Sequence, residues 1–247
     1  MTPTRAGLGL LLVRLALVGL FCLLGTLVWW ATTGSRPFPP GPVVASLALI
    51  PVNLFCLWLV RRLYRHQGRG LREVFGGSPR DVGWGLLWVV VLWVPFVLAI
   101  MAVMWLLHGA AMFTAFETVF VDPDAVPALP AAVALTLGIV TVLTFAPLNA
   151  PAEELVYRGY AQSALATRWP LGAAIACSAV VFGLQHAFFA PTRDAMIVYV
   201  GAFTVWGLGS GLIVARQGRL LPITIAHFVV NLATSAPAVI FPLVVPG

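Results

Sequence analysis

The sequence contains no lysine and few charged residues of any kind. Charged residues make up only 9% of the 247 residues, whereas hydrophobic residues make up 61%. Soluble domains average about 25% charged residues, so this chain cannot cover a water-facing surface of its size. We therefore exclude a soluble globular domain and expect a chain whose surface is solvated by lipid.

Cysteine is also scarce. Cys22, Cys56 and Cys177 lie within apolar runs and have no mutual metal-ligand spacing, which excludes a disulfide scaffold and predicts small packing residues. The net charge of +6 would suggest nucleic acid in a soluble chain. Here the arginines flank hydrophobic stretches, as they do at the ends of membrane helices, so we expect no nucleic-acid binding.

Long hydrophobic stretches are what the sequence does contain. A spanning helix needs about 20 apolar residues, and such stretches lie near 8–31, 40–60, 83–107, 131–166, 171–190, 195–215 and 221–245. The fourth stretch is too long for one straight crossing, and because Pro147 and Pro151 interrupt it, we expect a kinked or two-piece helix. The sequence thus predicts an all-α, polytopic integral membrane protein with about seven to eight transmembrane helices, forming a single domain over 1–247.

The arginines predict which ends of the helices face the cytoplasm. The loop between the second and third stretches is rich in arginine, and cytoplasmic loops carry an excess of basic residues. Alternation from this loop places the N-terminus, Arg168, Arg216 and Arg219 inside. The opposite side receives the loop 108–130, with Glu117, Asp122 and Asp124, together with Arg36 and Arg193. The all-arginine composition favours a bacterial plasma membrane.

Polar side chains inside the spans form a compact set. An ionisable group at mid-membrane costs roughly 2.5–3.5 kcal/mol on insertion scales, so each one needs a partner or a task. The set comprises Glu153, Glu154, Arg158, His186, His227 and Asn231. Counting from the flanking arginines at 1.5 Å per residue places these groups at overlapping depths, so we expect one site that opens to the cytoplasm.

Helical spacing predicts different tasks for the two glutamates. Glu154 and Arg158 are four residues apart on one helix face and should pair. Glu153 lies about 140° from Arg158 around the helix, so it is predicted to be the free carboxylate, suited to general acid–base work. The alternative is that both glutamates only join helices. Arg14, within the first span, has no partner that the sequence identifies.

Three motifs on successive hydrophobic segments carry a family resemblance. They are Glu153-Glu154-x-x-x-Arg158, Phe182-x-x-x-His186 and His227-x-x-x-Asn231. In this order, over about 151–235, they resemble the CPBP family of intramembrane peptidases, the CAAX protease and bacteriocin-processing group that is also called Abi. The resemblance implies an all-α fold, a catalytic core over about 131–235, a polar cavity open to the cytosol, and peptide-bond hydrolysis there.

The resemblance also implies a role for each residue. Glu153 would activate a water that His186 also holds, while His227 and Asn231 would donate hydrogen bonds to the oxyanion. Glu154 and Arg158 would orient the site. A zinc site formed by Glu153, His186 and His227 is the alternative. Because the sequence has no HExxH motif, we expect no metal or other cofactor.

Three functions fit these observations. The first is an intramembrane endopeptidase, similar to a CAAX prenyl endopeptidase, that cuts a membrane-associated or prenyl-type peptide or protein in or at the lipid bilayer. The second is a non-catalytic bacteriocin-immunity or membrane scaffold protein, which would not need the complete polar set. The third, a small ion or proton transporter, is disfavoured because the sequence shows no inverted repeats. The complete set therefore favours the peptidase.

Overall fold

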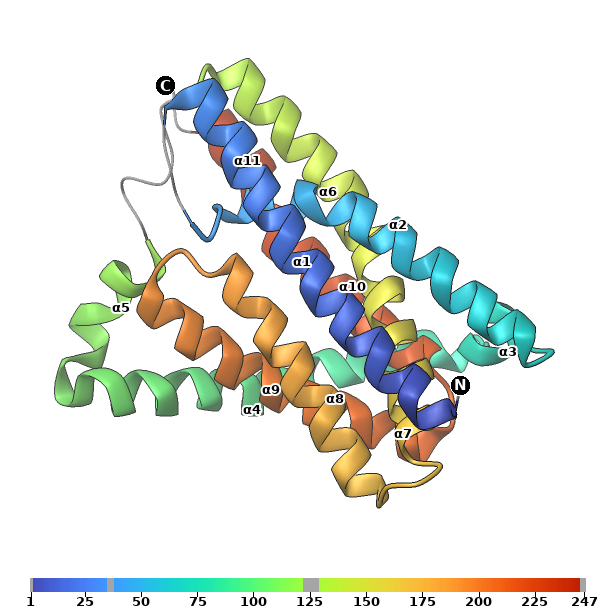
Figure 1. Cartoon of the computed structure of the whole chain (residues 1–247). Coiled ribbons are helices and arrows are strands. Elements are labelled where there is room, and N and C mark those ends of the chain that lie inside the picture. Colours follow the sequence, from blue (N-terminus) through green and yellow to red (C-terminus); the bar gives the residue numbers. More distant parts are fainter. Residues whose placement is uncertain (1, 35–37, 122–128, 245–247) are drawn as a thin grey trace.

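A computed structural model describes residues 2–34, 38–121 and 129–244 (Figure 1). Within these ranges the regular structure is helical throughout and contains no strand. The helices longer than one or two turns are α1 (Pro3–Thr33), α2 (Pro42–His66), α4 (Arg80–His108), α5 (Met112–Phe120), α6 (Ala131–Glu154), η2 (Leu155–Gln162), α8 (Leu171–Gln185), α9 (Arg193–Gln217), α10 (Leu221–Ser235) and α11 (Pro237–Val244). The shorter ones are α3 (Leu71–Phe75), η1 (Gly109–Ala111), α7 (Ser163–Leu165) and η3 (His186–Phe189). The predicted all-α fold is confirmed.

Among the described residues, seven helical segments are long and apolar enough to cross a membrane. They cover Pro3–Thr33, Pro42–His66, Arg80–Phe120, Ala131–Leu165, Leu171–Phe189, Arg193–Gln217 and Leu221–Val244. Their outer faces carry large apolar side chains, such as Leu106, which is 81% exposed, and Leu143, which is 69% exposed. Lipid solvates such a surface, whereas water does not. The chain is an integral membrane protein, and the seven predicted stretches are confirmed.

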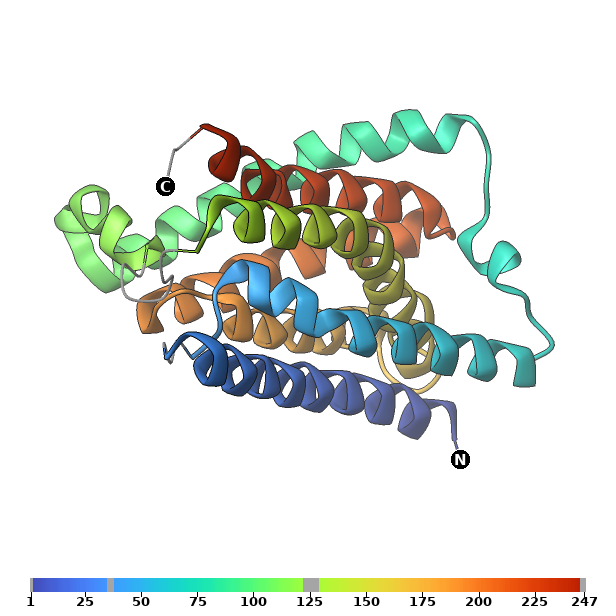
Figure 2. The ribbon, with the colours of Figure 1, turned by 90° about the horizontal axis from the view of Figure 1, so that it is seen from above.

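The α6–η2 segment occupies the centre of the bundle. Helix α6 packs against α2 on one side and α10 on the other (Figure 2), and η2 contacts α1 and α8. Every residue of η2 is buried. The motif that carries Glu153, Glu154 and Arg158 therefore lies where helices from both halves of the chain can reach it.

The fourth span bends as predicted, but its prolines do not end the helix. Helix α6 continues through Pro147 and Pro151 to Glu154, and the chain then widens into the π-helix η2. Figure 2 shows the bend where α6 passes into η2. Each proline lacks an N–H and leaves a carbonyl of the preceding turn without its helical donor, which loosens the helix ahead of this point. Both glutamates thus lie directly before a π-helical turn, a feature frequent at functional sites.

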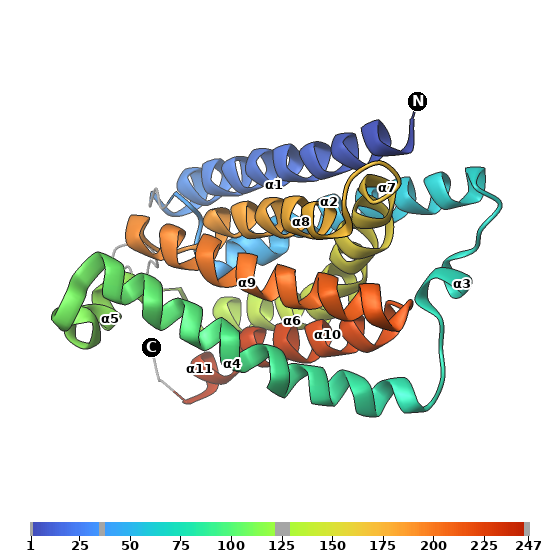
Figure 3. The same ribbon diagram turned by 90° about the horizontal axis from the view of Figure 1, so that it is seen from below.

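The connections that are rich in arginine gather at one end of the bundle. Figure 3 shows the N-terminal end of α1, helix α3, helix α7 and the α9–α10 connection at this end. The Thr4 and Thr167 hydroxyls lie 3.5 Å apart, and the Leu220 N–H donates to the Phe75 carbonyl at 3.2 Å. The predicted grouping of the basic connections is therefore present. That this end faces the cytoplasm stays a prediction.

The segment 108–130 was expected to be a loop, and this prediction is wrong for its first half, which forms η1 and α5. The Thr192 hydroxyl donates to the Val119 carbonyl at 2.6 Å, and the Phe120 and Tyr199 rings stack at 6.0 Å. The third hydrophobic stretch was expected to end near 107, whereas the residues of α5 fold as a further helix that contacts α9. Asp122 and Asp124, and also Arg36, lie outside the described residues.

Helices α8 and α9 approach closely at two glycines. A Cβ atom on Gly207 would lie 2.9 Å from the Cα of Ala179, and one on Gly211 would lie 2.9 Å from Ile175 Cγ2. We expect Gly207→Val to lower the free energy of unfolding by about 1–3 kcal/mol, because the helices would have to separate. Unfolding in mixed detergent micelles measures this effect. Gly9→Val is the control, since a Cβ on Gly9 meets nothing within 4 Å; equal losses in both variants would contradict the prediction.

Candidate active site

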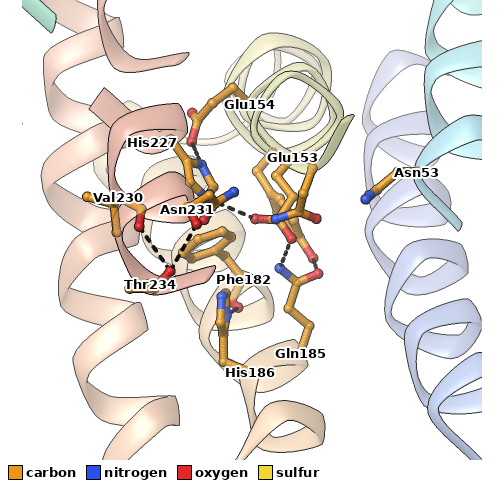
Figure 4. Close-up of polar contacts among 12 residues, drawn as sticks. Asn53, Glu153, Glu154, Phe182, Gln185, His186, His227, Val230, Asn231 and Thr234 are labelled. Atoms are coloured by element: carbon orange, nitrogen blue, oxygen red, sulfur yellow. Dashed lines mark hydrogen bonds and ion pairs between the residues drawn. The ribbon is translucent and has the colours of Figure 1, made fainter. Parts of the chain in front are cut away.

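The six polar residues predicted to share a site meet in the interior of the bundle: Figure 4 shows five of them together, and Arg158 joins them through its hydrogen bond to Glu154. Two glutamates and an arginine come from α6 and η2, one histidine from the start of η3, and a histidine and an asparagine from α10. None of the six is more than 8% exposed. The predicted site residues therefore lie together inside the bundle; their depth in a membrane stays a prediction.

Glu154 is shared by Arg158 and His227. Arg158 Nη1 donates to Glu154 Oε1 at 3.2 Å, which confirms the predicted pair, and His227 Nδ1 lies 2.8 Å from the same oxygen. Because an ionised carboxylate only accepts hydrogen bonds, His227 carries a proton on Nδ1. Its other nitrogen, Nε2, lies 3.4 Å from Glu153 Oε2. Figure 4 shows the His227 ring between the two glutamates.

Glu153 is not a free carboxylate, so the prediction that it lacks a cationic partner is wrong. Arg14 Nη2 lies 2.8 Å from Glu153 Oε1, and both side chains are buried. Gln185 Nε2 donates to the same oxygen at 2.7 Å. The helical-wheel argument considered only cations on the same helix, whereas Arg14 comes from α1, 139 residues earlier in the chain.

Arg14 has several partners, although the sequence identified none. Its Nε donates to Gln185 Oε1 at 3.1 Å, and its Nη2 also lies 3.1 Å from Asn53 Oδ1 and 3.3 Å from Asn149 Oδ1. The Tyr157 hydroxyl donates to Gln185 Oε1 at 2.8 Å. The sequence did not identify these four polar residues, Asn53, Asn149, Tyr157 and Gln185, as members of the cluster. Their occurrence within otherwise apolar spans was the available signal, because polar groups in the membrane interior are costly.

The buried charges in the cluster balance one another. Glu153 pairs with Arg14 at 2.8 Å, and Glu154 pairs with Arg158 at 3.2 Å. An isolated buried charge is strongly unfavourable, whereas a hydrogen-bonded pair is tolerated. Two anions and two cations sum to zero, so the interior can hold all four without a charge on either histidine.

Five buried polar atoms of the cluster lack a hydrogen-bond partner among the described residues, namely Arg14 Nη1, Glu153 Oε2, Glu154 Oε2, Arg158 Nη2 and Asn231 Nδ2, and two of them suit the chemistry of hydrolysis. Neither Glu153 Oε2 nor Asn231 Nδ2 has a hydrogen-bond partner among the described residues, although both are buried. The first is an acceptor and the second is a donor. A proton acceptor and a nearby amide donor are the groups that a hydrolysis with an activated water requires.

His186 is fixed by aromatic neighbours. Its Nδ1 lies 2.7 Å from the Phe182 carbonyl oxygen, which can only accept, so Nδ1 carries the proton. Its ring stacks on Phe203 with 3.5 Å between centroids and 8° between planes. In the neutral ring Nε2 is then the acceptor. No hydrogen bond joins His186 to Glu153 in the described part of the chain.

A zinc site formed by Glu153, His186 and His227 was the alternative to a metal-free site. Within the described ranges, no three His, Cys, Asp or Glu side chains are placed so that they could hold a metal ion. Of the three residues named for the zinc alternative, Glu153 has its Oε1 engaged by the Arg14 guanidinium and the Gln185 amide. The expectation of a metal-free site stays a prediction.

A cavity approaches the cluster from the arginine-rich end of the bundle. It has a volume of about 230 Å³ and is lined by Tyr64, Arg158, Gln162 and Arg219, among others. Arg158 belongs both to this lining and to the polar cluster. The resemblance implied a polar cavity, and this one lies beside the predicted site.

Comparison with known proteins identifies the central and C-terminal part of the chain. Residues 132–233 match the family model described as type II CAAX prenyl endopeptidase Rce1-like. The chain matches no curated protein and no solved structure. The matched range contains all six predicted site residues, whereas Arg14 and Asn53 precede it. The family predicted from the three motifs is thereby confirmed by the model that matches residues 132–233.

Proposed function

We propose that the protein is an intramembrane endopeptidase that hydrolyses a peptide bond of a membrane-associated, prenyl-type peptide or protein with water activated by Glu153. The observation that carries this proposal is the unequal use of the two carboxylate oxygens. Oε1 is held by Arg14 and Gln185, whereas Oε2 has no hydrogen-bond partner in the described ranges and lies 3.4 Å from His227 Nε2. Glu154 Oε2 also lacks a partner, but Glu153 Oε2 lies beside His227 Nε2, and a general base needs an unoccupied oxygen.

In the proposed reaction Glu153 first accepts a proton from water and then donates it to the leaving group. The water oxygen bonds to the carbonyl carbon of the substrate while one water proton moves to Glu153 Oε2. The carbonyl oxygen becomes an oxyanion, and Asn231 Nδ2 stabilises it by donating a hydrogen bond. Glu153 then gives its proton to the leaving nitrogen as the C–N bond breaks. The products are a carboxylic acid and an amine, and Glu153 returns to its ionised form.

The two histidines support this chemistry in different ways. His227 already donates from Nδ1 to Glu154, so it can donate to the oxyanion from Nε2 only when both nitrogens are protonated. Asn231 needs no such change. His186, with Nδ1 held by the Phe182 carbonyl, offers Nε2 as an acceptor that orients the water. Glu154 and Arg158 fix the position of the His227 ring.

The surroundings of the cluster suit a substrate at a membrane. The cavity that reaches Arg158 has arginine and tyrosine in its lining, which suits a polar peptide. The outer faces of the helices are apolar and would leave the lipid part of a substrate in the bilayer. The description of the matched family supports a prenyl-type substrate in particular.

Cleavage of a quenched fluorescent peptide library by the purified protein in detergent tests the proposal. We expect cleavage by the wild type, loss of at least about a hundredfold in His227→Ala, and wild-type rates in His66→Ala. His66 is the matched control because it lies exposed at the end of α2, away from the cluster. A folded wild type that cleaves no peptide, or equal cleavage by both variants, would overturn the peptidase and leave the immunity or scaffold function.

Metal chelation tests the nature of the water activation. Because the glutamate mechanism needs no Lewis acid, we expect prolonged treatment with a chelator, followed by its removal, to change the cleavage rate by less than about twofold. The rate is compared before treatment, after treatment and after addition of Zn²⁺. Loss on chelation with recovery on Zn²⁺ would instead assign Glu153, His186 and His227 to a metal site.

A further inference from the structure

One charged residue of the cluster lies outside the range that matches the family. We propose that Arg14, on α1, is a positioning residue that determines which oxygen of Glu153 acts as the base. The inference rests on the proposed peptidase function and adds to it a part of the chain that precedes residues 132–233.

The contact between Arg14 and Glu153 is made through one nitrogen only. Arg14 Nη2 lies 2.8 Å from Glu153 Oε1, while Arg14 Nη1 and Glu153 Oε2 are both buried without a hydrogen-bond partner in the structure as described. Arginine and carboxylate groups frequently pair through two parallel hydrogen bonds, which would occupy both oxygens. Here the end-on arrangement leaves Oε2 available to take a proton.

Neutral amides hold the guanidinium in this end-on orientation. Asn53 from α2, Asn149 from α6 and Gln185 from α8 each accept a hydrogen bond from Arg14, at 3.1, 3.3 and 3.1 Å. If Arg14 served only to neutralise the charge of Glu153, none of these three amides would be needed. Asn53 and Asn149 share Nη2 with Glu153 and Gln185 engages Nε, so rotation into the two-bond arrangement would break these contacts.

Gln185 completes the positioning of the carboxylate. Its Nε2 donates to Glu153 Oε1 at 2.7 Å, while its Oε1 accepts from Arg14 and from the Tyr157 hydroxyl. Glu153 Oε1 therefore has two donors from two different helices. With that oxygen fixed, Oε2 is directed toward His227 Nε2, 3.4 Å away. Helices α1 and α2 thus take part in building the site.

Steady-state kinetics of Arg14→Gln test this inference. We expect kcat to fall at least about a hundredfold with KM within about threefold, because orientation of the base matters in the transition state more than in substrate binding. Arg14→Lys should recover about tenfold of that loss, since it keeps the charge but not the geometry. The matched control is Arg5→Gln, which changes an exposed arginine near the N-terminal end of the same helix and should behave as the wild type.

Two further measurements distinguish positioning from a general effect on folding. Methylguanidinium should raise kcat of Arg14→Ala at least about tenfold, whereas methylammonium should not. Asn53→Ala keeps the ion pair but removes one constraint on the guanidinium, so kcat should fall about three- to tenfold at unchanged KM. If Arg14→Gln does not fold, Asn53→Ala decides the question.

The outcomes separate this inference from the proposed function. A folded Arg14→Gln variant with wild-type kcat, a change confined to KM, or wild-type kcat in Asn53→Ala would each overturn the positioning role and leave the peptidase intact. A folded wild type without peptidase activity would overturn both proposals.

Discussion

Glu153→Gln should lower kcat by about a thousandfold, the largest effect on activity that we expect from any single substitution. General acid–base groups contribute about 10²–10⁴-fold to enzymatic rates. The glutamine side chain has nearly the same volume and can still accept hydrogen bonds from Arg14 and Gln185 through its amide oxygen. It cannot take a proton from water, so the loss should appear in kcat while substrate binding is preserved.

The control for this variant is Glu117→Gln, which changes an exposed carboxylate on α5, outside the polar cluster. Gel filtration and thermal unfolding establish that both variants are folded, because Glu153→Gln also removes the counter-charge of the buried Arg14. Glu117→Gln should retain wild-type kcat. A folded Glu153→Gln variant that keeps more than about a tenth of the wild-type kcat would show that another group is the base.

The sequence predicted those features that depend on local spacing. Apolar runs of sufficient length predicted the seven spans, because a helix must satisfy its own backbone in lipid. The four-residue spacing of Glu154 and Arg158 predicted their hydrogen bond, which the structure shows at 3.2 Å. Both predictions use only the period of the α-helix and the solvent around it.

Features that depend on packing between distant helices were not predictable in this way. The pair formed by Arg14 and Glu153 joins α1 to α6, and no periodicity relates residues 139 positions apart. Helix α5 was not predicted for the same reason, because its stability depends on contacts with α9 such as the hydrogen bond from the Thr192 hydroxyl to the Val119 carbonyl. The sequence signal in the first case was the unexplained arginine in a span, which required a partner without indicating which one.

Substitutions in the pair formed by Glu154 and Arg158 should affect stability and activity separately. Arg158→Met should lower the free energy of unfolding by about 3–5 kcal/mol, because it leaves Glu154 buried without a counter-charge. It also removes a guanidinium that lies 4.1 Å above the Phe182 ring. Chemical unfolding in mixed micelles measures the loss.

The double variant Arg158→Met/Glu154→Leu should regain most of that stability, because replacing both members of a buried ion pair by apolar residues is often neutral or favourable. It should not regain activity, since His227 loses the carboxylate that accepts from Nδ1 at 2.8 Å and with it the fixed orientation of its ring. Recovery of both stability and activity would mean that Glu154 and Arg158 have only a structural role. Recovery of stability alone would mean that the pair is kept in the membrane interior because it holds His227 in place beside the oxygen of Glu153 that takes the proton.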